Sequence, residues 1–239
     1  MIGKLFATAF TVMVFTVTAL ADTARVDLND GTSLAADIHQ PKDAKAAVLF
    51  LHQCNRDQKM WAPIVEQLAE AGIGTMTVDF RGFGKSKTET YDAKSDYNKA
   101  ISFFADDVQA VHRAWADATP DVIVRGVVGA SCGGAAAAML AGAYSDIKAM
   151  VLLSPSLREF WFPAENWESL HTRAGLPVLA IAAVGDRRAT TSAERVMMKS
   201  SAGYTEYVRY NNSLHGHPLF EHDPNLPKKI SIWLTQILK

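Results

Sequence analysis

A serine stands between two glycines in residues 129–133, which read GASCG. The segment follows an apolar run, 122–128, that predicts a buried strand, and it leads into small residues, 133–143, that predict a helix. A G-x-S-x-G sequence between a strand and a helix is typical of a nucleophile elbow, a tight turn that exposes the serine. The glycines leave room for the turn, and the helix N-terminus favours negative charge developing beside the serine. We therefore predict that Ser131 is a nucleophile.

A serine hydroxyl needs a base, and two later residues complete a candidate catalytic triad. Asp186 follows the apolar run 177–184, and His215 follows the extended stretch 205–210. The order serine, acid, histidine is that of nucleophile-elbow enzymes, and both positions would lie at the carboxyl ends of strands, where ligands bind. We predict that Ser131 attacks, that His215 takes and returns the proton, and that Asp186 orients the imidazole.

His217 is an alternative base, because residues 215–217 read HGH. We favour His215, since the glycine directly after it gives its ring space to approach the serine. Asp223 is a weaker candidate for the acid, because it follows the histidine. Together with His222 these histidines show no spacing typical of zinc, so no metal site is predicted.

Strand-like apolar runs alternate with helix-like segments along the chain. This alternation predicts βαβ units, and hence a mostly parallel sheet with helices on both faces. The expected strands are 32–39, 46–52, 73–80, 122–128, 147–153, 177–184 and 205–210, and the expected helices are 58–71, 97–118, 133–143, 191–201 and 226–238. No linker or repeat divides residues 22–239, so we expect a single α/β domain there. An aromatic-rich stretch, 154–175, is expected to be a short insertion over the site.

Two more segments connect the sequence to a known family. LHQCN at 51–55 resembles the L-H-G-x segment of α/β-hydrolases, and DFRGFGKS at 79–86 resembles their D-x-R-G-x-G-x-S segment. With the elbow, Gly185-Asp186 and His215-Gly216, these matches follow the family order along almost the whole of residues 22–239. The chain thus resembles the dienelactone-hydrolase-like branch of small serine esterases. The resemblance implies the α/β-hydrolase fold with a sheet of about eight strands, and it implies no metal or organic cofactor.

The sequence departs from the family pattern at two places. Gln53 stands where the family usually has glycine, which could put a polar side chain beside the oxyanion hole and narrow the acyl pocket. Dienelactone hydrolases carry cysteine at the nucleophile position, whereas this chain has Ser131 there and Cys132 after it. Lactone specificity is therefore not carried over.

The resemblance also assigns an oxyanion hole, the pair of N–H groups that binds the developing negative charge. One donor would be the backbone N–H of Cys132, and the other that of Cys54, with Gln53 as second choice. Cys54 and Cys132 are the two cysteines of the chain. They could be small buried thiols. The sharper hypothesis is a Cys54–Cys132 disulfide that joins the two oxyanion segments.

Other residues near the expected site have supporting roles in this interpretation. Trp161 and Phe162 either line the acyl or leaving-group pocket or simply cover the edge of the sheet. Asp79 and Arg81 are expected to form a turn and an ion pair beneath the site. His52 is expected to support the oxyanion loop by hydrogen bonding rather than to act as a second base.

Residues 1–21 resemble a secretory signal peptide. Lys4 precedes an apolar run, and Ala19 and Ala21 are small residues at the positions that signal peptidase inspects. The run has about 16 residues, fewer than the roughly 20 that span a bilayer. We therefore expect cleavage after Ala21 and a periplasmic or secreted protein without stable membrane insertion, rather than one with an N-terminal membrane anchor. In that oxidising setting a cysteine pair can form a disulfide.

The charge balance argues against a nucleic-acid partner. Lys and Arg number 24 against 25 Asp and Glu, whereas binding a polyanion needs clustered positive charge. We instead expect a serine hydrolase that cleaves an ester, lactone or thioester of a small molecule through an acyl-serine intermediate. Two alternatives stay open: a peptidase that uses the same triad, and a non-catalytic binding protein on a hydrolase scaffold.

Overall fold

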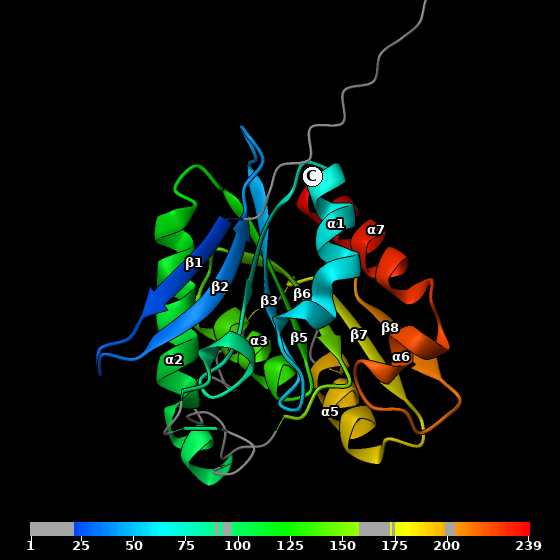
Figure 1. Ribbon diagram of the computed structural model, residues 1–239. Helices are drawn as coiled ribbons and strands as arrows, with labels where there is room; N and C mark the ends of the chain where they lie inside the picture. Colours follow the sequence, from blue (N-terminus) through cyan, green and yellow to red (C-terminus); the bar gives the residue numbers. More distant parts are fainter. Residues whose placement is uncertain (1–21, 89–90, 93–96, 158–172, 174, 199–203) are drawn as a thin grey trace, which may run out of the picture.

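The computed structural model describes residues 22–88, 91–92, 97–157, 173, 175–198 and 204–239. Their strands form one eight-stranded sheet with helices around it (Figure 1). The strand order is β1-β2-β4-β3-β5-β6-β7-β8. The pairs β1–β2 and β2–β4 are antiparallel, and all other neighbouring strands are parallel. The predicted mostly parallel sheet is thus confirmed. The predicted signal peptide, 1–21, lies outside the described residues, as does most of the predicted insertion.

The elements follow the predicted rhythm along the chain. The strands are β1 (Asp22–Asp27), β2 (Ser33–His39), β3 (Ala46–Leu51), β4 (Gly74–Val78), β5 (Val124–Ala130), β6 (Ile147–Leu153), β7 (Val178–Ala183) and β8 (Glu206–Tyr210). The helices are η1 (Gln58–Trp61), α1 (Ala62–Glu70), η2 (Gly84–Ser86), α2 (Tyr97–Ala118), α3 (Cys132–Ala143), α5 (Arg187–Met197), α6 (Pro218–His222) and α7 (Leu226–Leu238).

The differences from prediction have local causes. β1 was not predicted, because its sequence DTARVD is short, charged and mostly exposed at the sheet edge. The predicted helix 58–71 is two helices, since Pro63 lies in the first turn of α1, where a missing N–H is tolerated. α5 begins earlier than predicted, at Arg187, because the Asp186 side chain caps it by accepting the N–H of Ala189.

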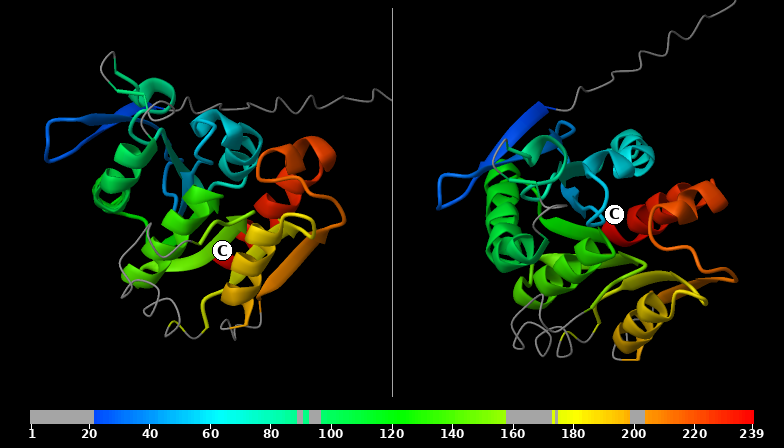
Figure 2. Two further views of the ribbon diagram at one scale, coloured as in Figure 1. Left: turned by 90° about the horizontal axis from the view of Figure 1, so that it is seen from below. Right: turned by 60° about the horizontal axis from the view of Figure 1, so that its bottom comes forward.

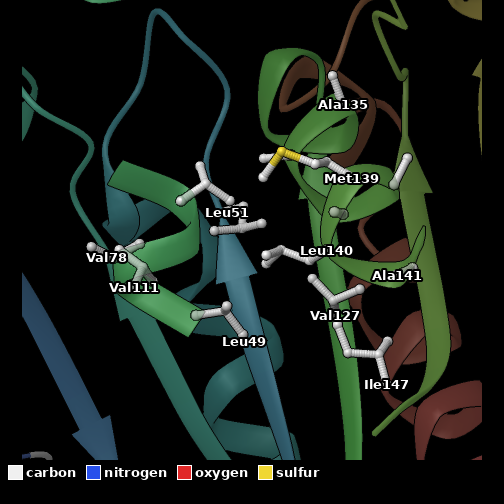
Figure 3. Packing of buried hydrophobic residues seen from close by; sticks show 14 of the residues in the cluster. Leu49, Leu51, Val78, Val111, Val127, Ala135, Met139, Leu140, Ala141 and Ile147 are labelled. Carbon is white, nitrogen blue, oxygen red and sulfur yellow. The ribbon is translucent and has the colours of Figure 1, made fainter. Parts of the chain in front are cut away.

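Helices cover both faces of the sheet. α1 and α7 pack together on one face, while α2, α3 and α5 lie on the other (Figure 2). β3 is buried along its whole length because alternate side chains enter two cores. Leu49 and Leu51 contribute to the core beneath α2 and α3 (Figure 3). Val48 and Phe50 contribute to the core beneath α1 and α7.

The N-terminus of α3 lies directly against the end of β3. A Cβ atom added at Gly133 would stand 2.2 Å from the carbonyl oxygen of Leu51 and 2.5 Å from that of His52. These are backbone atoms of a buried strand end, which cannot move aside as a flexible side chain can. The absence of a side chain at Gly133 is therefore what allows α3 to approach the sheet this closely.

We expect Gly133→Ala to lower the free energy of unfolding by about 3 kcal/mol, because the added methyl group overlaps backbone that cannot move aside. The matched control is Gly134→Ala in the same helix turn, where the nearest atoms, those of Pro155, lie 3.1 Å and 3.2 Å from the new Cβ. Urea unfolding followed by circular dichroism measures both. Equal stability of the two variants would contradict the close approach.

Candidate active site

The turn between β5 and α3 is a single residue, Ser131. Its backbone has φ 53° and ψ −115°, a conformation that a residue with a side chain adopts only under constraint. A Cβ at Gly129 would lie 2.0 Å from the carbonyl oxygen of Gly133, so the strand and helix touch on either side of the serine. The sharp turn expected from the glycine spacing is present.

Neighbouring strand ends hold this turn in place. The Ser131 N–H donates to the carbonyl of Leu153 over 3.0 Å. The Ser131 carbonyl accepts the N–H of Ser156 at 3.0 Å and that of Ala135 at 3.2 Å. Both backbone groups of the strained residue are therefore paired, and two of the partners come from the end of β6 and the loop after it.

The structure brings Ser131, His215 and Asp186 together from the loops after β5, β8 and β7. His215 Nε2 lies 2.8 Å from Ser131 Oγ, and His215 Nδ1 lies 2.5 Å from Asp186 Oδ2. When Nδ1–H donates to the carboxylate, the lone pair of Nε2 accepts the serine hydroxyl. The Asp186 side chain is 13% exposed and that of His215 is 36% exposed, so the acid is shielded while the base reaches solvent. The arrangement can take a proton from Ser131.

The two rival residues contact other groups. His217 Nδ1 lies 3.7 Å from Glu221 Oε1, and the ring packs against Phe220 with centroids 5.7 Å apart. Asp223 accepts the Tyr210 hydroxyl at 2.7 Å and a hydrogen bond from Lys229 at 2.7 Å. The Lys229 ammonium, with Tyr210, holds the pKa of Asp223 at about 2. His215 and Asp186, rather than these residues, are the ones that reach Ser131 and each other.

Cys54 and Cys132 form a disulfide with their Cα atoms 5.9 Å apart. It joins the loop after β3 to the first residue of α3, directly after Ser131. Among the described residues, neither of the two cysteine N–H groups has a backbone acceptor. Within the part of the chain that the structure describes, two N–H groups without a backbone acceptor thus lie on the two segments that the family resemblance assigns to an oxyanion hole, and the disulfide connects these segments.

His52 is fully buried and supports the loop after β3, which carries Gln53 and Cys54 and is called the oxyanion loop below. Its Nδ1 bonds to the carbonyl oxygen of Gln53 at 2.8 Å, and its Nε2 accepts the N–H of Phe80 at 2.9 Å. Burial lowers the pKa of the imidazole to about 4, so the ring is neutral near pH 7. With both ring nitrogens used, His52 connects the ends of β3 and β4, in the structural role that we predicted.

The predicted ion pair between Asp79 and Arg81 is wrong. Asp79 is buried and instead accepts the N–H groups of Gln58 and Lys85, both at 2.8 Å, and burial raises the pKa of its carboxyl group. Arg81 makes two hydrogen bonds to Asp107 of α2, at 2.7 and 2.8 Å. Arg81 also pairs with Asp30 at 2.5 Å. Its two acidic partners lie 26 and 51 residues away, whereas short-range sequence reasoning chose the nearer carboxylate.

Gln53 and Ser154 contact the loop of His215. Gln53 Oε1 accepts the N–H of His217 at 3.0 Å, and Ser154 Oγ accepts the N–H of Gly216 at 2.9 Å. The sequence predicts that Gln53 narrows an acyl pocket, and it indicates no role for Ser154. A serine at the end of an apolar strand gives no signal of its positive φ of 45° or of its distant partner.

A cleft of about 550 Å³ lies beside the oxyanion loop. It is lined by Asn55, Arg56, Asp57, Lys59, Met60, Phe83, Gly84, Lys87 and His217. Most of these side chains are polar or charged. The two predicted substrate-binding aromatics, Trp161 and Phe162, lie outside the described residues.

Within the described part of the chain, no three His, Cys, Asp or Glu residues gather in an arrangement that could hold a metal ion. In the same residues, no helix combines the length and hydropathy needed to cross a membrane.

The sequence model of the family described as "Serine aminopeptidase, S33" matches residues 42–174, more than half of the chain. The chain belongs to this family. It is a hydrolase of the α/β-hydrolase fold. The S33 match includes Ser131, Cys54 and Cys132 and ends before Asp186 and His215. A search of curated proteins finds no match.

Solved structures share the fold of this S33 family member. The esterase Pf2001 of Pyrococcus furiosus superposes with a TM-score of 0.70 at 16% identity, covering 96% of this chain and 98% of that one. A dienelactone hydrolase from Anabaena variabilis gives 0.66 at 20% identity, covering 92% and 98%. EstE1, a carboxylesterase cloned from a metagenomic library, gives 0.66 at 19% identity, covering 95% and 92%. At these identities the likeness shows the fold.

The buried His52 makes stability depend on pH. Its pKa is about 4 in the folded chain and near the ordinary 6.5 when unfolded, so the unfolded chain binds more protons between these values. This contribution to stability is present above pH 6.5 and falls by about 2 kcal/mol on going from pH 7.5 to pH 5. Urea unfolding at both pH values should show a smaller loss for His52→Gln than for the parent. An equal loss would show that His52 is not the group responsible.

Proposed function

We propose that this chain hydrolyses carboxylic esters, lactones or thioesters of small molecules through an acyl-serine intermediate. The observation that carries the proposal is the chain of two hydrogen bonds, 2.8 Å from Ser131 Oγ to His215 Nε2 and 2.5 Å from His215 Nδ1 to Asp186. A serine hydroxyl at the tip of a strained turn, with a base in contact, is the arrangement that nucleophilic catalysis requires.

The proposed reaction has two halves. As Ser131 Oγ attacks the substrate carbonyl carbon, its proton moves to His215 Nε2, and Asp186 stabilises the resulting imidazolium. The tetrahedral intermediate collapses, the bond to the alkoxide or thiolate breaks, and His215 returns the proton to that leaving group. Water then repeats the sequence against the acyl-serine, releasing the carboxylic acid and restoring Ser131.

The negative charge that develops on the carbonyl oxygen would be bound by the N–H groups of Cys132 and Cys54. Donors of this kind contribute most when they are already in position before the reaction. Two features support such preorganisation: the Cys54–Cys132 disulfide, and the N-terminus of α3, whose partial positive charge favours an anion.

The ester class is supported by the solved structures of the same fold, which include an esterase, a dienelactone hydrolase and a carboxylesterase. The description of the matching family favours a second candidate, removal of an N-terminal amino acid from a peptide. An assay of p-nitrophenyl esters graded by acyl length beside aminoacyl p-nitroanilides separates the two. Faster turnover of the anilides would favour the peptidase.

We further propose that residues 1–21 direct export and that the mature chain acts in the periplasm or outside the cell. The signal-like sequence supports this, and so does a disulfide at the site, because disulfides persist in oxidising compartments.

Ser131→Ala is expected to reduce hydrolysis of short p-nitrophenyl esters by about 10⁴-fold or more and to abolish labelling by a fluorophosphonate probe, because the attacking oxygen is lost. Ser231→Ala is the matched control, since Ser231 lies in α7 and its hydroxyl donates to the Pro227 carbonyl of the same helix. It should keep the activity of the parent. Turnover that survives in Ser131→Ala would exclude the acyl-serine mechanism.

Exported protein, denatured without reductant, should show no free thiols in a thiol titration, and reductant should release both cysteines. Deletion of residues 2–21 should retain the chain in the reducing cytoplasm, where we expect the two thiols to be free. Finding two free thiols in the exported protein would refute the proposed oxidising location of the site.

A further inference from the structure

The loop that carries His215 is held at its backbone by two side chains from distant parts of the chain. The N–H of Gly216 donates to Ser154 Oγ, 62 residues away, and the N–H of His217 donates to Gln53 Oε1, 164 residues away. Neither side chain bonds to Ser131 or to the His215 ring. The position of the base therefore depends on groups outside the triad.

Gln53 is itself rigidly placed. Gln53 is only 5% exposed. Its backbone N–H donates to Met60 Sδ at 3.4 Å. Its carbonyl oxygen accepts from the Arg56 N–H at 2.9 Å and bonds to His52 Nδ1 at 2.8 Å. The next residue is Cys54, which is covalently bonded to the elbow. An amide on such a segment holds a defined position rather than sampling solvent.

The Gln53 side chain also packs closely against the backbone of Gly216. Gly216 has φ +67°, and a Cβ there would lie 1.9 Å from Gln53 Oε1. The amide thus lies close against the backbone of Gly216 while accepting the N–H of His217. A side chain at 216 would overlap the Gln53 amide on this course of the loop.

We propose that Gln53 is a positioning residue for catalysis, which fixes the His215 loop to the oxyanion loop so that His215 Nε2 meets Ser131 Oγ. The inference rests on the proposed function for its effect on rate, and on geometry alone for its effect on the loop. Through Gln53 and Cys54, adjacent residues of one loop connect to the base on one side and to the elbow on the other. Ser154 gives the His215 loop a second support from the end of β6.

The test compares Gln53→Met, which keeps the length of the side chain and removes the strong acceptor, with Gln53→Glu, which keeps an acceptor oxygen. We expect Gln53→Met to lower kcat on a short p-nitrophenyl ester by about 10- to 100-fold with little change in KM, because a small misplacement of a catalytic group slows chemistry rather than binding. Gln53→Glu should recover a substantial part of kcat. Gln67→Met is the matched control for the substitution itself and should behave as the parent, because Gln67 is a partly buried residue of α1 whose side chain donates to the Pro63 carbonyl of the same helix.

A second readout does not depend on activity. Hydrogen exchange at the 215–217 amides should be faster in Gln53→Met than in the parent, while the melting temperature changes little. An unchanged kcat in Gln53→Met would overturn the positioning role, and so would a Gln53→Glu variant as slow as Gln53→Met. If the parent itself is inert towards esters, the proposed function fails, and the exchange rates alone decide whether Gln53 holds the loop. Should Gln53→Met not fold, Gln53→Ala carries the same comparison.

Discussion

The single-residue turn at Ser131 is the constraint on which the site depends. A non-glycine residue with φ 53° and ψ −115° is strained by roughly 1–3 kcal/mol, and it persists only where its surroundings leave no alternative. Those surroundings are the touching backbones of Gly129 and Gly133, and the paired N–H and carbonyl groups of the serine. These contacts hold Ser131 in the turn between the strand and the helix.

The parallel strands explain why residues far apart in sequence meet. β5, β7 and β8 all run in the same direction, so the loops after them open on one edge of the sheet. Ser131, Asp186 and His215 each occupy one of these loops. A parallel sheet brings such loops into one region, but it does not by itself place their side chains within hydrogen-bond distance of one another. The side chains that bridge the loops do that, and Gln53 and Ser154 are two of them.

The features that neighbouring residues determine could be predicted from the sequence, and those that depend on contacts between distant segments could not. The elbow at Ser131 has local determinants, two glycines between an apolar strand and a small-residue helix, and was predicted with its role. Asp186 and His215 were chosen by chain order and strand ends, which are also local features. The acceptor roles of Gln53 and Ser154 and the pairing of Arg81 with Asp107 depend on contacts between distant segments, for which one sequence carries no periodic or compositional signal. β1 lacks an apolar pattern because it is an exposed edge strand.

The Cys54–Cys132 bond has a second consequence, for the unfolded chain. It joins two residues that are 78 positions apart, and the closed ring contains β4, α2 and β5. In the chain-entropy model, a ring of this size lowers the conformational entropy of the unfolded chain, which stabilises the folded state by about 4.5 kcal/mol. The two ends of the ring are the two segments beside Ser131. One covalent bond therefore contributes both to the stability of the whole chain and to the placement of the segments beside Ser131, so a substitution of either cysteine changes the two together.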